Sequence, residues 1–101
     1  MNENFDITVA QLKEMLESGQ EFNFIDVRNE DEYEDDNLGA RLIPLGDLMD
    51  SLDELEPLKG QDIYVHCRSG ARSGRAKEIL LGNGFTKVHN VLGGIMAYRN
   101  Q

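Results

Sequence analysis

The chain contains a single cysteine, Cys67, and its surroundings favour chemistry over simple packing. Residues 62–67 are rich in β-branched and aromatic side chains, which predicts a strand that ends at Cys67. A helix is expected to follow, from about residue 72 to 81. A lone cysteine at the end of a strand is often a buried, inert side chain, but a thiol close to the start of a helix can become a nucleophile. Cys67 is therefore the candidate catalytic residue.

The loop between this strand and this helix is the candidate substrate-binding segment. A tight loop before a helix can direct its backbone N–H groups at one point above the helix N-terminus. Gly70 can adopt the positive φ that such a turn usually needs. The same N–H groups lower the pKa of a thiol at the start of the loop and make it nucleophilic at neutral pH. The predicted substrate-binding residues are Arg68, Ser69, Gly70, Ala71, Arg72 and Ser73.

Basic residues are concentrated around Cys67 in an otherwise acidic chain. The 101 residues include 19 acids and 10 bases, which gives a net charge of −9 and argues against a nucleic-acid or anionic-membrane partner. The 15 residues between Asp62 and Glu78 contain four bases and no acid. This local concentration predicts an anionic substrate. His66 is expected to point to the opposite face of the strand and to be structural.

The rest of the chain supplies alternating strands and helices. Helices are expected over residues 9–18, 72–81 and 95–99, and strands over residues 22–27, 62–67 and 87–91. Residues 42–45 form a short extended piece, and the leucines from Leu45 to Leu55 then recur at helical spacing. The acidic run 30–36 is expected to be a solvated face with one helical turn. This order predicts a single α/β domain over residues 1–101, with a mostly parallel sheet and helices on both faces.

Composition excludes several other classes of protein. No apolar run exceeds four residues, so no membrane span is expected, and the N-terminus does not resemble a signal peptide. One cysteine cannot form an internal disulfide, and one cysteine with two histidines falls short of a structural zinc site unless carboxylates join it. We therefore expect a cytoplasmic protein with no metal, no cofactor, and no nucleic-acid or membrane partner.

Four short motifs follow one another along nearly the whole chain. They are 25–28 with Glu32-Tyr33, 43–45 with Leu48, Cys67 to Arg72, and Gly84-Phe85 with Val88 and Leu92-Gly93-Gly94-Ile95. In this order they resemble the motifs of the rhodanese family of sulfurtransferases. The motif from Cys67 to Arg72 resembles the active loop of that family, with a cysteine, an arginine, a glycine at the fourth place and a basic residue at the sixth. The other three resemble its first strand signature, the extended piece after it, and the closing strand and helix.

The resemblance implies a fold and a reaction. The fold would be a three-layer α/β/α arrangement around a mostly parallel sheet of about five strands. Cys67 would accept a sulfane sulfur from thiosulfate or a persulfide donor protein, carry it as a persulfide, and pass it to cyanide or a thiol acceptor. Arg68 and Arg72 would bind an anionic donor. Asp26, Arg28 and Glu32 would be structural, bracing the strand end next to the loop.

Two other functions are compatible with a cysteine at this position. A cysteine-dependent phosphatase, or an arsenate reductase-like enzyme, also has a strand ending in His-Cys before a loop and a helix. Phosphatase loops place arginine six positions after the cysteine, where this chain has Ser73, while Arg72 is at the fifth. A non-catalytic rhodanese-like docking module is the second alternative, and the retained Cys67 argues against it. The physiological donor, acceptor and pathway stay open.

Overall fold

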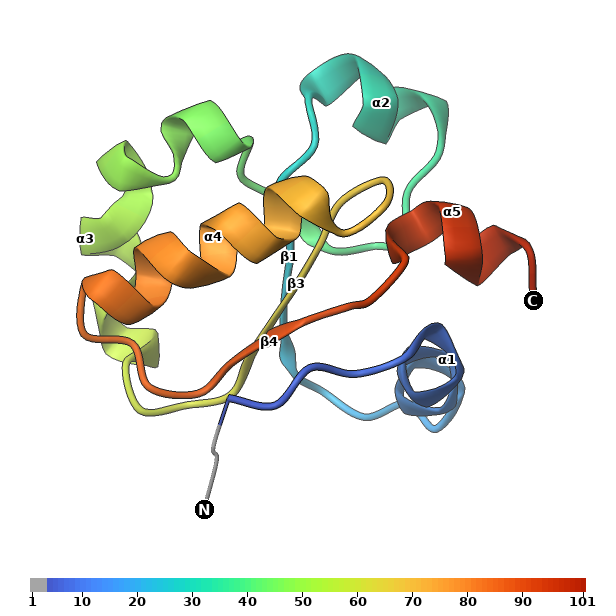
Figure 1. The fold of residues 1–101 in the computed structure, drawn as a ribbon, viewed down its shortest axis with the longest axis horizontal. Coiled ribbons are helices and arrows are strands. Elements are labelled where there is room, and N and C mark those ends of the chain that lie inside the picture. The colour runs from blue at the N-terminus through green and yellow to red at the C-terminus, as the bar shows by residue number, and fades with distance from the viewer. Residues whose placement is uncertain (1–3) are drawn as a thin grey trace.

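The computed structural model describes residues 4–101. Strands and helices alternate along them, as the sequence predicted (Figure 1). The strands are β1 (Asn23–Asp26), β2 (Arg41–Leu42), β3 (Ile63–His66) and β4 (Val88–Asn90). The α-helices are α1 (Val9–Glu17), α2 (Glu30–Asp35), α3 (Leu52–Leu55), α4 (Ala71–Gly82) and α5 (Gly94–Arg99), and short 3-10 turns are η1 (Leu45–Asp47), η2 (Met49–Ser51) and η3 (Glu56–Leu58).

The sheet within residues 4–101 has four parallel strands in the order β2-β1-β3-β4. The expected count of about five strands was wrong. Beyond β4 the sheet gains only an isolated parallel bridge between Ile7 and Val91. Ile7 accepts from the N–H of Leu92 and donates to the carbonyl of Asn90, but Thr8 caps α1 immediately afterwards. The chain therefore leaves the sheet edge before a fifth strand can form.

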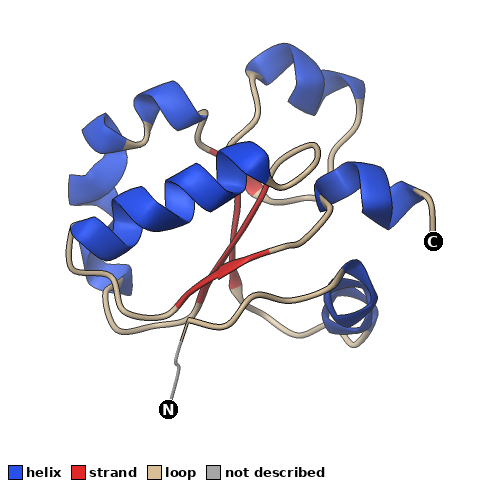
Figure 2. Ribbon diagram, in the orientation of Figure 1, coloured by secondary structure: helices blue, strands red, loops and turns tan. Residues whose placement is uncertain are grey.

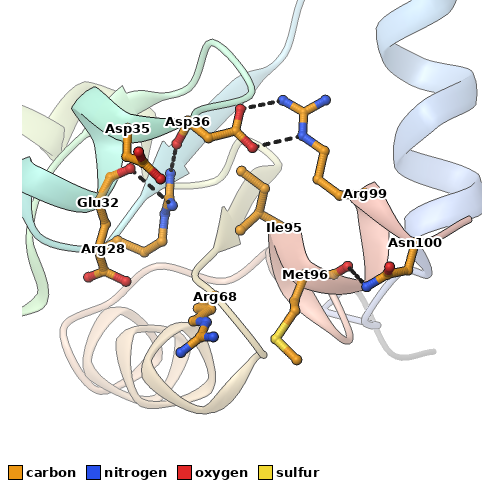
Figure 3. Close-up of a pocket in the computed structure, with 9 residues that line it drawn as sticks. All are labelled: Arg28, Glu32, Asp35, Asp36, Arg68, Ile95, Met96, Arg99 and Asn100. Atoms are coloured by element: carbon orange, nitrogen blue, oxygen red, sulfur yellow. Dashed lines mark hydrogen bonds and ion pairs between the residues drawn. The ribbon is translucent and has the colours of Figure 1, made fainter.

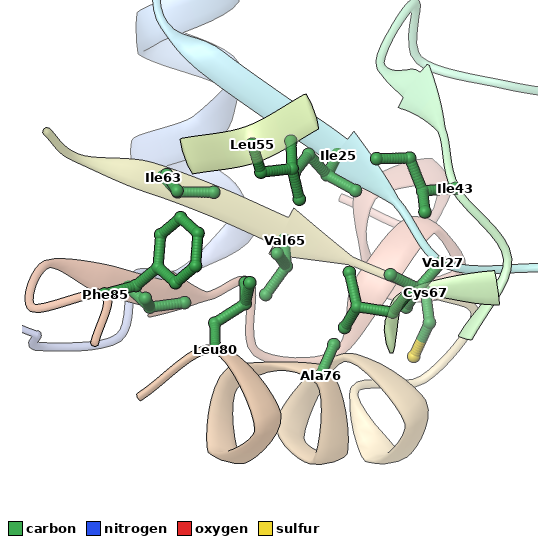
Figure 4. Packing of buried hydrophobic residues seen from close by; sticks show 12 residues of the cluster. Ile25, Val27, Ile43, Leu55, Ile63, Val65, Cys67, Ala76, Leu80 and Phe85 are labelled. Atoms are coloured by element: carbon green, nitrogen blue, oxygen red, sulfur yellow. The ribbon is translucent and has the colours of Figure 1, made fainter. Parts of the chain in front are cut away.

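Helices cover both faces of the sheet and make three layers (Figure 2). On one face, α3 and α4 pack over a cluster that includes Ile25, Val65 and Cys67 (Figure 4). On the other face, α1 packs against α5 over a smaller cluster built on Leu12 and Val91. The three-layer α/β/α arrangement inferred from the resemblance is confirmed.

Local sequence signals explain where most of these elements begin and end. Thr8 caps α1 through a reciprocal pair of hydrogen bonds with Gln11, at 3.2 and 2.8 Å. The leucines from Leu45 to Leu55 do not form one helix, because Gly46 and Ser51 are poor helix formers, and the segment breaks into η1, η2 and α3. A membrane-spanning helix needs about 20 residues, and no helix within residues 4–101 meets that requirement.

The strand topology defines the edge of the sheet at which a ligand is expected to bind. All four strands are parallel, so their carboxyl ends lie at the same edge. The loop after β3 emerges at that edge between α2 and α5 (Figure 1). Ligands of open α/β sheets bind at this edge, which is where Cys67 lies.

Candidate active site

Cys67 directly follows β3 and lies at the base of the loop that leads into α4. Its side chain contributes to the buried cluster beneath α4, and its sulfur points past the end of the sheet toward the first turn of that helix (Figure 4). The residue is 1% exposed. The predicted strand–loop–helix junction is therefore present, with the thiol at its base.

The loop turns hydrogen-bond donors toward the sulfur. Gly70 has φ +107°, a conformation that favours glycine, and its N–H donates to Cys67 Sγ at 3.1 Å. Burial raises the pKa of the Cys67 thiol, but the Ser73 hydroxyl and the loop N–H groups outweigh burial and lower it. Those N–H groups belong to Ser73, Gly70 and Ser69. The loop is thus built to hold a negative charge on sulfur.

Ser73 connects the thiol to the last strand. Its Oγ lies 3.4 Å from Cys67 Sγ and 2.5 Å from Asn90 Oδ1, and all three residues are buried. The amide of Asn90 donates in turn to the carbonyl of Gly70 at 3.2 Å. Asn90 therefore positions both Ser73 and the turn of the loop. No motif marks Asn90 in the sequence, and the pairing of β3 with β4 brings it here.

The start of α5 supports the loop through its backbone. The N–H groups of Ile95 and Met96 donate to the carbonyls of Cys67 and Arg68, at 2.9 and 3.0 Å. This approach needs a residue without a side chain at position 94, because a Cβ on Gly94 would collide with both carbonyl oxygens. Gly94 also has φ +59°. The closing helix is therefore part of the site's framework.

Arg72 is paired with an acid from a different element. Its two terminal nitrogens donate to the two carboxylate oxygens of Glu32, at 2.7 and 2.8 Å. Pairing with Arg72 lowers the pKa of Glu32 to about 2, against the opposing effect of burial. Pairing also raises the pKa of Arg72, to which the nearby charge of Cys67 contributes. Sequence spacing did not predict this pair, because its members lie 40 residues apart.

Arg68 differs from Arg72 because no acid in residues 4–101 pairs with it. Its exposed side chain lines a cavity of about 440 Å³ beside the loop (Figure 3). Acids of α2 form one wall of this cavity and α5 forms another. The lining residues are Arg28, Glu32, Asp35, Asp36, Arg68, Ile95, Met96, Arg99 and Asn100.

The other bases near Cys67 lie outside its immediate surroundings. Lys77 donates to Asp6 at 2.6 Å, and Arg75 is exposed and lies 3.6 Å from Glu78. Among the six predicted loop residues, Ser69 and Ala71 are exposed as well as Arg68. Most of the bases concentrated around Cys67 in the sequence are therefore paired with acids in the folded protein. Arg68 is the loop cation that has no ion-pair partner within residues 4–101.

A buried ion pair braces the end of β1 next to the loop. Arg28 donates to both carboxylate oxygens of Asp26, at 2.8 to 3.1 Å, and both residues are buried. Arg28 also donates to the carbonyls of Glu32 and Asp36 and so ties the C-terminal half of α2 to the end of β1. Burial lowers the pKa of the neighbouring His66. Its Nδ1 lies 3.2 Å from the Cys67 carbonyl, a contact with the main chain and not with the sulfur.

No group of three or more His, Cys, Asp or Glu side chains within residues 4–101 is arranged to hold a metal ion. The loop itself offers a stabilised thiolate, oriented N–H groups and the guanidinium group of Arg68, which has no acid partner in the part of the chain that the structure describes. Such a site can attack an electrophilic atom and hold the anionic product.

Comparison with known proteins agrees with this geometry. The chain is 34% identical over 97 residues to the putative sulfurtransferase YtwF of Bacillus subtilis, covering 95% of this chain and 91% of that protein. It is 38% identical over 72 residues to the thiosulfate sulfurtransferase PspE of Escherichia coli, covering 70% of this chain and 69% of that protein. It spans about half of two other Bacillus subtilis relatives, 48% of the putative sulfur carrier protein YrkF and 55% of YqhL.

Solved structures also have a similar fold. A rhodanese-like domain protein from Staphylococcus aureus superimposes with a TM-score of 0.82 at 31% identity, covering 94% of this chain and 90% of that chain. A family model for the rhodanese-like domain matches residues 8–101, which includes every element of the site. The chain therefore belongs to the rhodanese-like domain family.

Proposed function

We propose that this protein is a sulfurtransferase that carries sulfane sulfur on Cys67. The observation that carries the proposal is the buried Cys67 sulfur facing the Gly70 N–H at 3.1 Å, in a loop whose donors lower the pKa of the thiol. A persulfide places its charge one atom further out than a thiolate. The N–H groups that surround the sulfur suit that terminal anion as well.

The reaction has two steps, and each conserves atoms and charge. In the first, the Cys67 thiolate attacks the outer sulfur of the donor, the donor's S–S bond breaks, and its remainder leaves with the electron pair. Thiosulfate would release sulfite, and a protein persulfide would release a thiolate. In the second, a cyanide ion or an acceptor thiolate attacks the terminal sulfur of the persulfide, and Cys67 leaves as the thiolate.

The loop residues divide between holding the sulfur and holding the donor. Gly70 and Ser73 contact the sulfur, so they stabilise the thiolate and the persulfide. Arg68 has an exposed guanidinium group at the cavity wall, with no acid partner among residues 4–101, so it binds the anionic part of the donor. Arg72 is held by its pair with Glu32, and the N–H groups that the pair does not use are left to bind the donor. Ser73 stands where a phosphatase has its arginine, which disfavours phosphoryl transfer.

Intact mass measurement tests the proposal. Incubation with excess thiosulfate or with a protein persulfide should raise the mass by one sulfur atom, and cyanide should reverse the change. Cys67→Ser should abolish the adduct and all turnover while keeping the fold, because the substitution is nearly isosteric. Wild-type protein that gains no sulfur from either class of donor would overturn the sulfurtransferase assignment.

A further inference from the structure

The Glu32–Arg72 ion pair is partly buried, and a backbone contact fixes the position of Glu32. Glu32 is 26% exposed and Arg72 is 33% exposed, so the two hydrogen bonds between them are partly shielded from water. The same Glu32 carboxylate accepts from the N–H of Asn29 at 3.0 Å, which fixes it at the start of α2. The charge of Arg72 is therefore offset before any substrate arrives.

The cavity beside the loop is also balanced in charge. Three arginines, Arg28, Arg68 and Arg99, line it together with three acids, Glu32, Asp35 and Asp36 (Figure 3). Arg28 and Glu32 are paired with residues outside the wall, Asp26 and Arg72, and when these partners are included four positive and four negative side chains leave no net charge. The whole chain carries −9. A doubly charged donor therefore meets little net attraction at this site, although a basic residue stands at both expected positions of the loop.

We infer that Glu32 is a specificity-determining residue: by holding Arg72 in a neutral pair, it favours singly charged sulfane donors over doubly charged thiosulfate. The biological donors of that class are persulfides, R–S–S⁻. This inference rests on the proposed function and names the donor class of the same site. Glu32 does not touch the reacting sulfur, and it acts through Arg72 and through the charge of the cavity wall.

Two small donors isolate the effect of charge. Thiosulfate is a dianion, whereas methanethiosulfonate, CH3SO2–S⁻, is a monoanion with the same kind of reacting bond. In both, the Cys67 thiolate attacks the outer sulfur and the bond between that sulfur and the oxidised sulfur breaks. Sulfite leaves in the first case and methanesulfinate in the second, each with the electron pair, and Cys67 keeps the transferred sulfur as a persulfide.

The experiment measures the second-order rate constant of persulfide formation by intact mass, for each donor, at low ionic strength. Glu32→Gln keeps an oxygen acceptor for Asn29 and for one N–H of Arg72, but removes the charge. We expect it to raise the ratio of the thiosulfate constant to the methanethiosulfonate constant by about three- to tenfold. High salt should shrink this gain, because exposed charges are screened.

Two further variants make the result specific. Glu34→Gln removes the same charge from an exposed position on α2 that forms no ion pair with any of residues 4–101, and it should change the ratio less than twofold. Arg72→Gln leaves Glu32 unpaired, and it should lower the ratio. Thermal unfolding of each variant shows that the compared proteins are folded. If Glu32→Gln itself failed to fold, the direction of the Arg72→Gln change would still test the inference.

The outcomes separate this inference from the proposed function. A folded Glu32→Gln variant with the wild-type ratio would overturn the inference, and so would an equal effect of Glu34→Gln, because general charge would then explain it. An unchanged ratio in Arg72→Gln would overturn it as well. If the wild type formed no persulfide with either donor, the failure would lie in the proposed function instead.

Discussion

Two opposing influences act on the sulfur of Cys67. Burial favours the neutral thiol, whereas the Ser73 hydroxyl and the loop N–H groups favour the thiolate and lower the pKa. The hydroxyl has only one proton and three acceptors within reach, Cys67 Sγ, Asn90 Oδ1 and the carbonyl of Gly70. Whether that proton serves the sulfur can be measured directly.

Iodoacetamide labelling tests the state of the thiol. In the wild type, the labelling midpoint should lie below the free-thiol value of about 8.5. Ser73→Ala removes one donor to the thiolate, so the midpoint should rise toward that value. Ser69→Ala is the matched control, because it removes an exposed hydroxyl and keeps the backbone N–H. An unchanged midpoint in Ser73→Ala would mean that the backbone N–H groups alone stabilise the thiolate.

Arg68 should contribute more to thiosulfate use than any other surface cation near the loop. Its guanidinium group lies at the cavity wall without an acid partner in residues 4–101. Arg68→Ala should lower kcat/KM for thiosulfate by about three- to tenfold, the scale of one exposed charge-assisted contact. Arg75→Ala removes the same charge from the exposed surface of α4 and should change kcat/KM less than twofold. Equal losses of kcat/KM in the two variants would show that Arg68 acts only through the overall charge of the protein and does not contact the donor.

At the scale of elements, α5 and α2 hold the active loop from two sides. The N-terminal N–H groups of α5 bind the carbonyls of Cys67 and Arg68, and Glu32 of α2 binds Arg72 at the start of α4. The geometry of the loop therefore depends on helices that contain none of its residues. Each of these supports can be weakened separately.

Gly94→Ala should separate α5 from the loop. The added Cβ would meet the carbonyl oxygens of Cys67 and Arg68, so the helix must shift, and the protein should lose about 2–4 kcal/mol of stability. Gly60→Ala is the control, because Gly60 also has positive φ but open space around it, and it should lose only about 1–2 kcal/mol. Chemical denaturation measures both, and persulfide formation should slow in Gly94→Ala alone. Equal stability losses would show that the close approach is not a constraint.

The ion pair between Glu32 of α2 and Arg72 of α4 should make the stability of the protein depend on pH. The pKa of Glu32 is about 2 in the folded protein, against 4.5 as its ordinary value. Between these pH values the unfolded state binds more protons than the folded state, so the free energy of unfolding falls as the pH falls. At pH 7, Glu32→Gln should be less stable than the wild type by about 1–2 kcal/mol. This difference should shrink from pH 4.5 toward pH 2, and a difference independent of pH would contradict the ion pair.

At the scale of the whole molecule, the features that could be predicted from the sequence are those that residues close together in the chain determine. The helix expected from residue 9, the strand expected up to Cys67 and the turn at Gly70 follow from local signals. The structure contains all three, although the strand ends at His66, one residue before Cys67. The contacts that build the site were not predictable in this way. Glu32 and Arg72 lie 40 residues apart, Ser73 and Asn90 lie 17 apart, and Asp6 and Asn90 lie 84 apart. Only the order of the strands brings these pairs together.

The longest of these connections joins Asp6, which lies before α1, to Cys67. Asp6 Oδ1 accepts from the backbone N–H of Asn90 at 2.9 Å and from Lys77 at 2.6 Å. Asn90 in turn binds Ser73, which lies against Cys67. The segment before α1 therefore supports the candidate active site, and it also contains Ile7, which bridges to Val91 at the edge of the sheet.

Two substitutions at Asp6 separate these roles. Asp6→Asn keeps an oxygen for the N–H of Asn90 and loses the ion pair with Lys77, so it should cost at most about 1 kcal/mol of stability and leave the labelling midpoint of Cys67 unchanged. Asp6→Ala also leaves the N–H of Asn90 without its partner, which should cost about 1–3 kcal/mol more. As Asn90 loosens, Ser73 loses its fixed position, and the midpoint should rise toward the free-thiol value. If Asp6→Ala destabilised the protein but left the midpoint unchanged, the N-terminal segment would support the fold without reaching the thiol, because the loop would hold Cys67 independently of β4.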